Sequence, residues 1–259
     1  IRHWGIDVIL LYNFPQLVLA KAASGRCRVV FDVADDLLAM FRHEAGRWAP
    51  VLCPIARRFF DELVSTSDLV TTPSASLAGG LARRAHVLPN GADLLAATEA
   101  DGRVIRSRYR PPIVGFVGAF EYFVDFGLIL EAARLLPEVT FLLVGDGRER
   151  TRVAEQVRWE GLANVSLTGA VPYPRNLDYV QAMDIGLVPL KPGPVGDSAA
   201  PLKLFEYAAL GKPIIATPLM ETLEIAGDFV NVARGAQETA ALIERILRDP
   251  REFGERVKV

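Results

Sequence analysis

Short runs of apolar residues alternate along this chain with longer stretches in which apolar residues recur every three or four positions. The short runs have the length of buried β-strands, and the longer stretches have the period of helices with one apolar face. Such alternation is typical of βα units whose strands form a parallel sheet. The pattern therefore predicts an α/β fold.

The alternation occurs in two series. In the first series, the predicted strands cover residues 8–12, 28–32, 69–72 and 85–88, and the predicted helices cover 15–23, 48–64 and 74–82. In the second series, the strands cover 113–117, 139–144, 165–168, 185–188, 214–216 and 229–232, and the helices cover 125–136, 148–159, 176–181, 201–210 and 237–247.

The hydrophobic pattern is interrupted between the two series, from the Asn90-Gly91 turn signal to the stiff Pro111-Pro112 pair. We predict a first domain over residues 1–100, a linker over 101–112 and a second domain over 113–259. The second series is long enough for a whole Rossmann-like domain. The first series is too short, so we expect that domain to be partial, with its opening units missing. Two such domains would face a cleft at the carboxyl ends of their strands, where open α/β sheets bind ligands.

Composition and charge narrow the classes of function. Lys and Arg together number 29 and Asp and Glu 31, which gives a net charge of −2 and argues against nucleic acid as a partner. Cys27 and Cys53 lack the spacing of a disulfide framework or a metal site, and we expect two buried thiols of a reducing compartment. No apolar run is long enough to span a membrane, and the first residues, from Ile1 to Trp4, do not have the pattern of a signal peptide. We predict a cytoplasmic protein.

The segment at residues 199–213 carries the clearest chemical signal. Pro201 suits the first position of a helix, whose free backbone N–H groups from Leu202 onward would form an anion site. Lys203 in the first turn opposes the helix dipole, which is easier to understand if an anion shares the site. Glu206 lies three residues further along, on the same helix face. The alternative is a salt bridge between Lys203 and Glu206 on a solvated helix.

Several stretches resemble motifs of one enzyme family, in that family's order and spacing. The main ones are PLKLFEYA at 201–208 with GKP at 211–213, VLPNGAD at 87–93 and VGFVG at 114–118. Weaker matches are LVGDG at 143–147, VSLTG at 165–169 and AMDIGLVP at 182–189. On these motifs the chain resembles the GT-B glycosyltransferases, in particular the retaining family-four group, also called glycosyl transferases group 1.

The resemblance implies an enzyme that moves a sugar from a nucleotide-diphosphate donor to a glycan, lipid-linked or small-molecule acceptor. It implies retention of the anomeric configuration, with neither a metal nor a cofactor, and points to polysaccharide biosynthesis. His3, His43 and His86 are scattered and offer no zinc site or catalytic triad.

The resemblance also assigns donor-binding residues. Glu206 matches the second glutamate of the family's pair, which is expected to hold the donor ribose. Lys203 and the helix N-terminus at Leu202 would face the diphosphate. Val171 and Pro172 would lie by the base.

Gly118 follows a predicted strand and Asp32 ends one, and each has two interpretations. Gly118 would let the backbone approach the phosphates because it has no Cβ, and the alternative is a tight βα turn. Asp32 stands where many relatives have a His-Asp pair, here Phe31-Asp32. It is the catalytic candidate that would meet the sugar or acceptor, and the alternative is an N-cap for the following segment.

Two departures from the family pattern bear on catalysis. The first glutamate of the pair is replaced by Ser198, with Asp197 beside it, so a ligand to the transferred sugar is altered or displaced by one position. The arginine and lysine that many members carry after the Gly118 turn fall on the uncharged Ala119 and, approximately, Val124. Lys203 and the helix dipole must then stabilise more of the leaving diphosphate's charge. In a front-face retaining transfer, the donor's own phosphate takes the acceptor proton, so a protein base is not required.

A mixture of basic and aromatic residues surrounds the predicted helix at 48–64. It suits a peripheral contact with anionic lipid at the inner face of a membrane, but a solvated helix with a buried aromatic face explains the same residues and is the favoured interpretation. The residues are Arg42, His43, Arg47, Trp48, Arg57, Arg58, Phe59 and Phe60.

Three rival functions remain open at this point. A nucleotide-sugar 2-epimerase on the same architecture would release a changed nucleotide sugar without an acceptor. A non-catalytic nucleotide-sugar binding module is compatible with Ser198 and with the uncharged loop at Ala119. A Rossmann dehydrogenase is disfavoured because Gly115 and Gly118 are not followed by the third glycine of the fingerprint.

Overall fold

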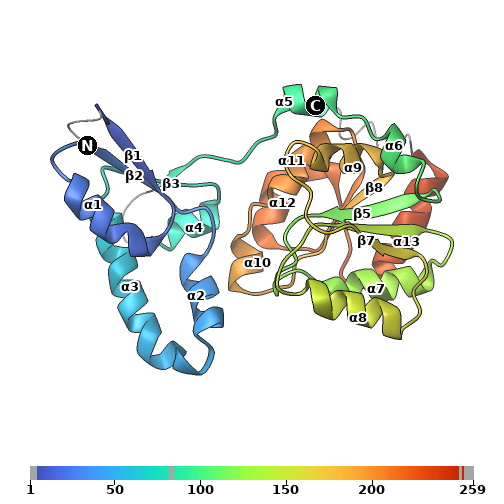
Figure 1. Ribbon diagram of the computed structural model, residues 1–259, viewed down its shortest axis with the longest axis horizontal. Coiled ribbons are helices and arrows are strands. Elements are labelled where there is room, and N and C mark those ends of the chain that lie inside the picture. The colour runs from blue at the N-terminus through green and yellow to red at the C-terminus, as the bar shows by residue number, and fades with distance from the viewer. Residues whose placement is uncertain (1–4, 82–84, 251–252, 254–259) are drawn as a thin grey trace. The chain divides into compact units, whose positions relative to one another are not determined.

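The computed structural model describes residues 5–81, 85–250 and 253. Two compact units make up the chain, and each is described separately below. The first unit comprises Ile1–Asn90 and Gly193–Ala200, and the second comprises Gly91–Pro192 and Pro201–Val259. Figure 1 shows the strands and helices of both units.

The first unit contains a four-stranded parallel sheet in the order β1-β2-β3-β4. Its strands are β1 (Val8–Leu11), β2 (Arg28–Asp32), β3 (Leu69–Thr72) and β4 (His86–Val87). The limits of β2 and β3 were predicted to the residue, whereas β1 and β4 are shorter than predicted. Parallel pairing of consecutive strands requires a crossover between them, which the helices supply.

The helices of the first unit lie between its strands. They are η2 (Phe14–Gln16), α1 (Leu17–Ala23), α2 (Leu37–Ala45), η3 (Gly46–Trp48), α3 (Ala49–Thr66) and α4 (Ala75–Gly79), with α10 (Pro194–Ser198) joining from later in the chain. The predicted helix at 74–82 ends earlier, at Gly79, and its residue 82 lies outside the described residues. Helix α2 was not predicted. Asp36 caps it by accepting a hydrogen bond from the Ala39 amide at 2.9 Å.

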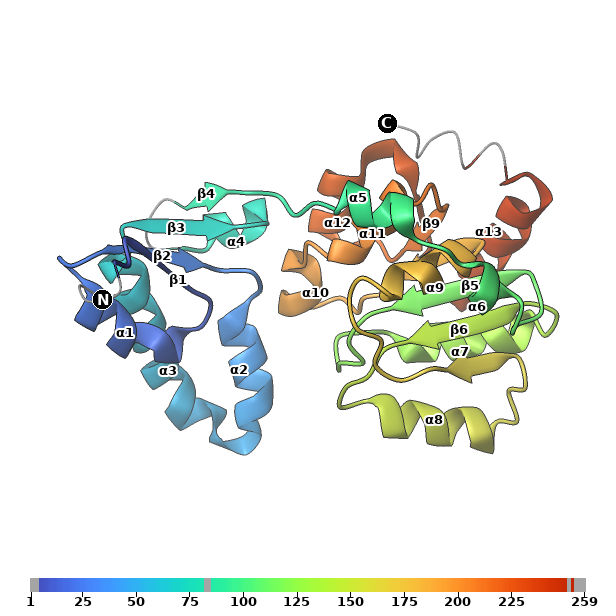
Figure 2. The same cartoon turned by 45° about the horizontal axis from the view of Figure 1, so that its top comes forward.

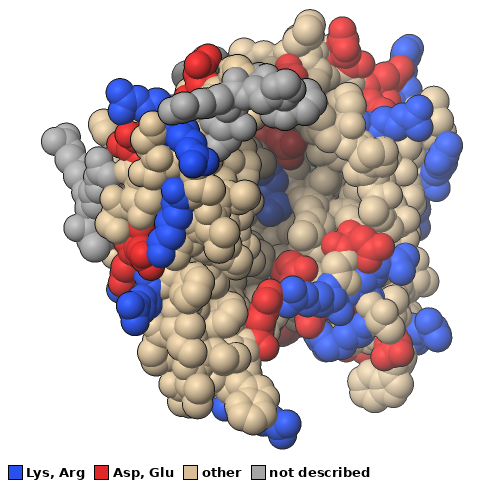
Figure 3. Space-filling view, turned by 60° about the vertical axis from the view of Figure 1, so that its left-hand side comes forward, with Lys and Arg blue, Asp and Glu red and all other residues tan. Residues whose placement is uncertain are grey.

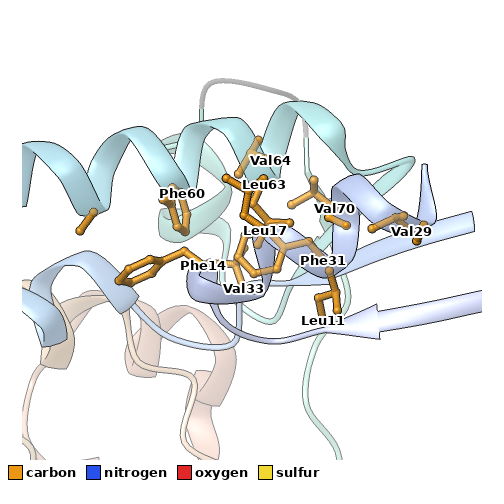
Figure 4. Close-up of a cluster of buried hydrophobic side chains, with 13 residues drawn as sticks. Leu11, Phe14, Leu17, Val29, Phe31, Val33, Phe60, Leu63, Val64 and Val70 are labelled. Atoms are coloured by element: carbon orange, nitrogen blue, oxygen red, sulfur yellow. The ribbon is translucent and has the colours of Figure 1, made fainter.

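The core of the first unit forms between its sheet and helix α3. Figure 4 shows Phe31 of β2 and Val70 of β3 beside Phe60 and Leu63 of α3, all of them buried. The rings of Phe31 and Phe60 meet edge to face with centroids 5.7 Å apart, a favoured aromatic geometry. The even spacing of apolar residues in the strands therefore places one side of the sheet against this helix.

The second unit contains a six-stranded parallel sheet in the order β10-β9-β8-β5-β6-β7. Its strands are β5 (Ile113–Val117), β6 (Thr140–Val144), β7 (Val165–Leu167), β8 (Ile185–Val188), β9 (Ile214–Ala216) and β10 (Val230–Val232). The strand order reverses between β5 and β8, which makes this the topological switch point of the sheet. Open α/β sheets bind ligands at such a point, beyond the carboxyl ends of the strands.

Helices cover both faces of this sheet. They are α5 (Leu94–Glu99), α6 (Arg103–Arg106), α7 (Phe126–Leu135), α8 (Arg150–Trp159), α9 (Asn176–Ala182), α11 (Leu202–Ala209), α12 (Met220–Ala226), η4 (Gly227–Phe229) and α13 (Ala236–Arg248). Figure 2 shows α7 and α8 on one face and α9 and α11 on the other. Helix α6 lies in the predicted linker at 101–112, and α5, just before it, and α12 were not predicted.

Charge is mixed on the face of the molecule shown in Figure 3, where Lys and Arg lie beside Asp and Glu. No helix among the described residues is long and apolar enough to cross a membrane. Cys27 and Cys53 are free, but both are partly exposed rather than buried as expected. Cys27 precedes β2 at the margin of the core, and Cys53 lies on the part of α3 that is only partly covered.

One side chain fixes α11 against the sheet. The hydroxyl oxygen of the fully buried Tyr207 accepts a hydrogen bond from the Val117 amide at 2.9 Å, at the carboxyl end of β5. Its ring lies over Gly186 of β8, where a Cβ would come within 2.3 Å of the Tyr207 ring. Burial raises the pKa of the Tyr207 phenol, so the hydroxyl stays protonated.

The Tyr207→Phe substitution tests this anchor. It keeps the ring but leaves the buried Val117 amide unpaired, which should reduce the free energy of unfolding by about 1–3 kcal/mol in denaturant titrations. The exposed Tyr12 offers a matched control, because Tyr12→Phe should leave stability unchanged within about 0.5 kcal/mol. Equal stability of Tyr207→Phe and Tyr12→Phe would show that the hydroxyl is not an anchor.

Candidate active site

Three glycines line the carboxyl ends of β5, β6 and β7. The Gly118 amide donates a hydrogen bond to the Val144 carbonyl at 2.9 Å, and the Gly145 amide donates one to the Gly169 carbonyl at 3.0 Å. A Cβ on Gly145 would lie 1.9 Å from the Gly118 carbonyl oxygen. The three loops are therefore in backbone contact. We call this carboxyl end of the sheet, lined by Gly118, Gly145 and Gly169, the glycine edge, and it presents main chain rather than side chains.

Lys203 of α11 lies across the end of β5. Its ammonium nitrogen is 5.2 Å from the centroid of the Phe116 ring, within the range of a cation–π interaction. A Cβ built on Gly118 would lie 3.1 Å from Lys203 Cε and 3.3 Å from Nζ. Gly118 also has a φ of +153°, which side-chain-bearing residues rarely adopt. The lysine therefore packs closely against Gly118, and a side chain at this position would have to displace it by a few tenths of an ångström.

Helix α11 begins one residue later than predicted. Pro201 is its N-cap, in extended conformation, and Leu202 is its first residue. Among the described residues, no side chain caps this end by a hydrogen bond. The Leu202 side chain is 55% exposed. The first turn thus combines the positive end of the helix dipole with the Lys203 ammonium, a favourable setting for an anion.

Glu206 lies one turn deeper in α11 and is partly buried. The Asn176 Nδ2 atom, at the start of α9, donates a hydrogen bond to Glu206 Oε1 over 3.4 Å. Burial raises the pKa of the Glu206 carboxyl, and the bond from Asn176 and the charge of Lys203 oppose this rise. The structure therefore places a carboxylate with a perturbed pKa beside a cation, a common property of functional sites.

The loop after β7 adds a tyrosine and reaches α5. Asp93 caps α5 by accepting a hydrogen bond from the Ala96 amide at 3.0 Å, and this bond, with one from the Tyr173 hydroxyl, lowers the pKa of Asp93. The pKa of Tyr173 is raised by desolvation and by the charges of Asp93 and Glu206, although its side chain is 57% exposed. Val171 and Pro172, expected beside the base, immediately precede this tyrosine.

Arg150, the first residue of α8, brings a second cation to the glycine edge. A Cβ on Gly169 would lie 3.7 Å from one terminal guanidinium nitrogen of Arg150. Its Nε is 4.0 Å from an Asp146 carboxylate oxygen. The sequence did not predict Arg150, Asn176 and Tyr173 as site residues, because segments far apart in the sequence must pack together before these side chains reach the site.

Asp32 and Ser198 both belong to the first unit. Asp32 ends β2 and accepts a hydrogen bond from the Thr71 hydroxyl at 2.6 Å. The alternative that Asp32 caps the next helix is wrong, because Asp36 does so. The Ser198 hydroxyl donates to the Pro194 carbonyl at 2.6 Å, inside α10. The neighbouring Asp197 carboxylate accepts from the Gly193 amide at 3.1 Å.

No group of three or more His, Cys, Asp or Glu side chains that could hold a metal ion occurs within the described ranges. The positive groups that approach the glycine edge are Lys203, Arg150 and the amide end of α11.

A family model described as "Glycosyl transferases group 1" matches residues 111–249, more than half of the chain. The chain therefore belongs to this glycosyltransferase family, as the motifs indicated.

Among curated proteins, it is 29% identical over 234 residues to TuaH of Bacillus subtilis (strain 168), a glycosyltransferase assigned to teichuronic acid biosynthesis. That match covers 85% of the chain and 58% of TuaH, so the chain spans little more than half of this relative's length. A 2-deoxystreptamine glucosyltransferase of Streptomyces kanamyceticus is 26% identical, over 96% of the chain and 70% of the relative.

Solved structures share the fold. Sucrose-phosphate synthase from Thermosynechococcus elongatus matches with a TM-score of 0.77 at 20% identity, over 98% of this chain and 69% of its own. Anabaena HepE, solved with UDP and glucose, matches with a TM-score of 0.72 at 21% identity, over 96% and 71%. These similarities confirm the predicted α/β fold of the GT-B class.

Gly118→Ala tests the close approach of Lys203. The new Cβ would meet the lysine and would hold an alanine at a φ that favours glycine, which should cost about 1–3 kcal/mol of unfolding free energy. Gly193 has a similar φ of +137° and no atom within 4 Å of a built Cβ, so Gly193→Ala isolates the backbone cost. A loss no larger at position 118 than at 193 would contradict the steric contact.

Proposed function

We propose that residues 113–259 bind a nucleotide-diphosphate sugar and that the whole protein transfers the sugar, with retention and without a metal, to a glycan or lipid-linked acceptor. The observation that carries the proposal is the position of Lys203 over Gly118 at the amide end of α11, with Glu206 one turn deeper. Membership of the family supports it, and so do the UDP and glucose named for HepE.

Each part of the donor would meet a group of matching chemistry. The diphosphate would lie against Gly118, between Lys203 and the first-turn amides at Leu202, because glycine lets the backbone approach and both partners are positive. The ribose hydroxyls would donate to Glu206, a charged acceptor. The base would lie along Val171 and Pro172.

The reaction would proceed at the donor's anomeric carbon. An acceptor hydroxyl oxygen forms a bond to this carbon on the face from which the diphosphate oxygen departs, and the departing diphosphate takes the hydroxyl proton. Lys203 and the helix dipole offset the negative charge that develops on the diphosphate. Asp32 would contact the sugar or the acceptor, and Ser198 stands in place of the family's first glutamate.

Binding measurements on two variants test the donor site. Glu206→Ala should weaken UDP binding by about 1–3 kcal/mol, because the ribose loses its acceptor. Lys203→Ala should weaken UDP binding much more than uridine binding, because the lysine is assigned to the diphosphate alone. Titration calorimetry with both ligands provides the measurement.

Two controls belong to the same titrations. Lys21, which pairs with Glu62 in the first unit, offers a matched lysine, and Lys21→Ala should leave UDP affinity unchanged. Equal losses of UDP and uridine affinity in Lys203→Ala would make this lysine structural. A thermal-shift panel of uridine, guanosine, adenosine and cytidine nucleotides identifies the donor base, since a ligand bound only by the folded state raises its apparent stability.

The Ser198 hydroxyl favours one rival, a module that binds nucleotide sugars without catalysis. This hydroxyl donates a hydrogen bond to the Pro194 carbonyl at 2.6 Å, within α10. A serine engaged in this way does not supply the carboxylate that the resemblance leads us to expect at this position. Binding of UDP-sugar without transfer or hydrolysis by the whole protein would support this rival. Release of an altered nucleotide sugar without an acceptor would instead support the 2-epimerase.

A membrane surface is the partner that helix α3 favours. Trp48, Val51 and Ile55 are 58%, 62% and 52% exposed, and Leu52 and Phe59 are exposed beside them. Successive helix residues turn by about 100°, so Val51, Leu52, Ile55 and Phe59 share one side of α3, distinct from the side that packs on the core, and Trp48 is the N-cap residue just before them. Phe60, expected in the same patch, is instead buried against Phe31.

Basic side chains border this apolar face. The Arg47 guanidinium lies 5.3 Å from the Trp48 ring centroid, and Arg58 is exposed. Aromatic and aliphatic residues flanked by arginine are typical of helices that lie in the interface of anionic membranes. The alternative was a solvated helix whose aromatic residues are buried. The exposure of Trp48 and Phe59 disfavours it.

Vesicle sedimentation tests the membrane contact. The double substitution Val51→Ser with Ile55→Ser should lower binding to phosphatidylglycerol-containing vesicles by at least about tenfold, because each buried aliphatic side chain contributes about 1.5–3 kcal/mol. Val18 and Leu19 of α1 are also exposed, and serine at both positions is the matched control, expected to bind normally. Equal binding of the two double variants would exclude α3 as the contact.

A further inference from the structure

Asn176 joins helices α9 and α11 at the candidate site. Its Nδ2 atom donates to Glu206 Oε1 over 3.4 Å, across the 30 residues that separate the two in sequence. Its Oδ1 atom is buried and has no hydrogen-bond partner in the part of the chain that the structure describes. The nitrogen of the Asn176 amide is thus bonded to the Glu206 carboxylate, and its oxygen is not bonded to any described residue.

Electrostatics fix the orientation of the Asn176 amide. Rotation by 180° would place Oδ1 against Glu206 Oε1, and two acceptors would then face each other without a proton between them. The observed orientation leaves one unsatisfied acceptor, but it keeps the carboxylate bonded. A hydrogen bond to a charged group contributes more than one between neutral groups, so the carboxylate bond determines the outcome.

The position of the pair in the fold limits how Glu206 can move. Helices α9 and α11 cover the same face of the second unit's sheet, as Figure 2 shows. Helix α11 is tied to β5 through Tyr207, the residue that follows Glu206. A carboxylate between two fixed helices has few orientations, and the Asn176 amide selects one of them.

We propose that Asn176 is a positioning residue that holds Glu206 as an oriented, ionised acceptor for the vicinal hydroxyls of a ribose, and thereby sets the preference for ribonucleotides over dideoxynucleotides. This inference rests on the proposed function. Asn176 acts through Glu206 and does not itself need to contact the donor. A site built to accept hydrogen bonds from hydroxyls rejects analogues that lack them, because its acceptors are then left unpaired.

The titratable groups near Glu206 do not change charge in the pH range where Glu206 titrates. Lys203 lies on the same helix, Tyr207 follows in sequence, and Tyr173 comes from the loop before α9. The pKa values of Tyr173 and Tyr207 are both raised, and desolvation is the largest cause in each case. Both phenols therefore stay neutral in mild acid. The pKa of Asp93, beside Tyr173, is lowered by its bond from the Ala96 amide, so Asp93 stays charged there.

The sign of the pH effect follows from these groups. Burial raises the pKa of Glu206 and the Asn176 bond lowers it, so removing the bond raises the pKa further. Protonation of Glu206 removes the charged acceptor, so UDP binding weakens as the pH falls through this pKa. Loss of the Asn176 amide should therefore move the acid limb of UDP binding to higher pH.

The experiment compares UDP affinity in the 259-residue chain with Asn176, with Asn176→Leu and with the isosteric Asn176→Asp, from about pH 5 to pH 8. The ligand's own phosphate titrates equally in every protein, so the ratio of affinities isolates Glu206. We expect Asn176→Leu to weaken binding about tenfold near neutral pH, as loss of a bond to a charged group implies. Asn176→Asp should move the acid limb further, because a second carboxylate raises the pKa of the first.

The second measurement is the ratio of affinities for UDP and 2′,3′-dideoxy-UDP. This ratio should fall toward one in Asn176→Leu and stay unchanged in Asn231→Ala, which removes an amide bond to the Ile214 carbonyl in β9. If Asn176→Leu does not fold, Asn176→Asp keeps the shape of the side chain and carries the test alone. A uniform loss of affinity, with the acid limb and the ratio unmoved, would make Asn176 merely structural.

The design separates this inference from the proposed function. Failure of the unaltered chain to bind UDP, or any other nucleoside diphosphate, would overturn the proposed function. Normal UDP binding by the unaltered chain, with unaltered pH dependence and hydroxyl preference in the Asn176 variants, would overturn only the role of Asn176.

Discussion

The second unit depends on a hydrogen bond between a helix and the end of a strand. Strands β5 and β8 are paired only at Val114 with Ile185 and at Gly115 with Gly186. Along their described lengths, the two strands are not paired beyond these residues, and the Val117 amide instead donates a hydrogen bond to the Tyr207 hydroxyl. A buried amide must find a partner, and here the partner belongs to the helix that carries Lys203 and Glu206. The same bond that completes the sheet therefore fixes the candidate site.

The charges at this site are few and lie close to backbone. The loop after Gly118 carries the uncharged Ala119 and Val124 at the approximate positions where the motif resemblance led us to expect basic residues. Lys203 lies over the glycine edge, and Arg150 approaches the same edge from α8. Because the edge is made of main chain, these two cations have no competing side chain at Gly118 or Gly169. A small number of positive groups can then act strongly on a bound anion.

Strands buried on both faces were predictable from sequence, often to the residue. The limits of β5, β8 and β9 matched because each is a short, continuous apolar run. Helices α2 and α5 were missed because neither buries a continuous apolar face: α2 has no fully buried residue, and Leu94 and Leu95 of α5 are exposed. The pairing of Asn176 with Glu206 could not be predicted, since no local pattern connects two residues on different helices. Lys203 and Glu206 were found early because one helix carries both and places them on one face.

Gly186 has a consequence for how this family can vary. A Cβ there would overlap the Tyr207 ring, so neither position can change alone without a cost in packing. An alignment of relatives should therefore show the two positions exchanging together, with a larger residue at 186 accompanied by a smaller one at 207. Such correlated substitution would record, across many genomes, the contact that seats this helix on its sheet.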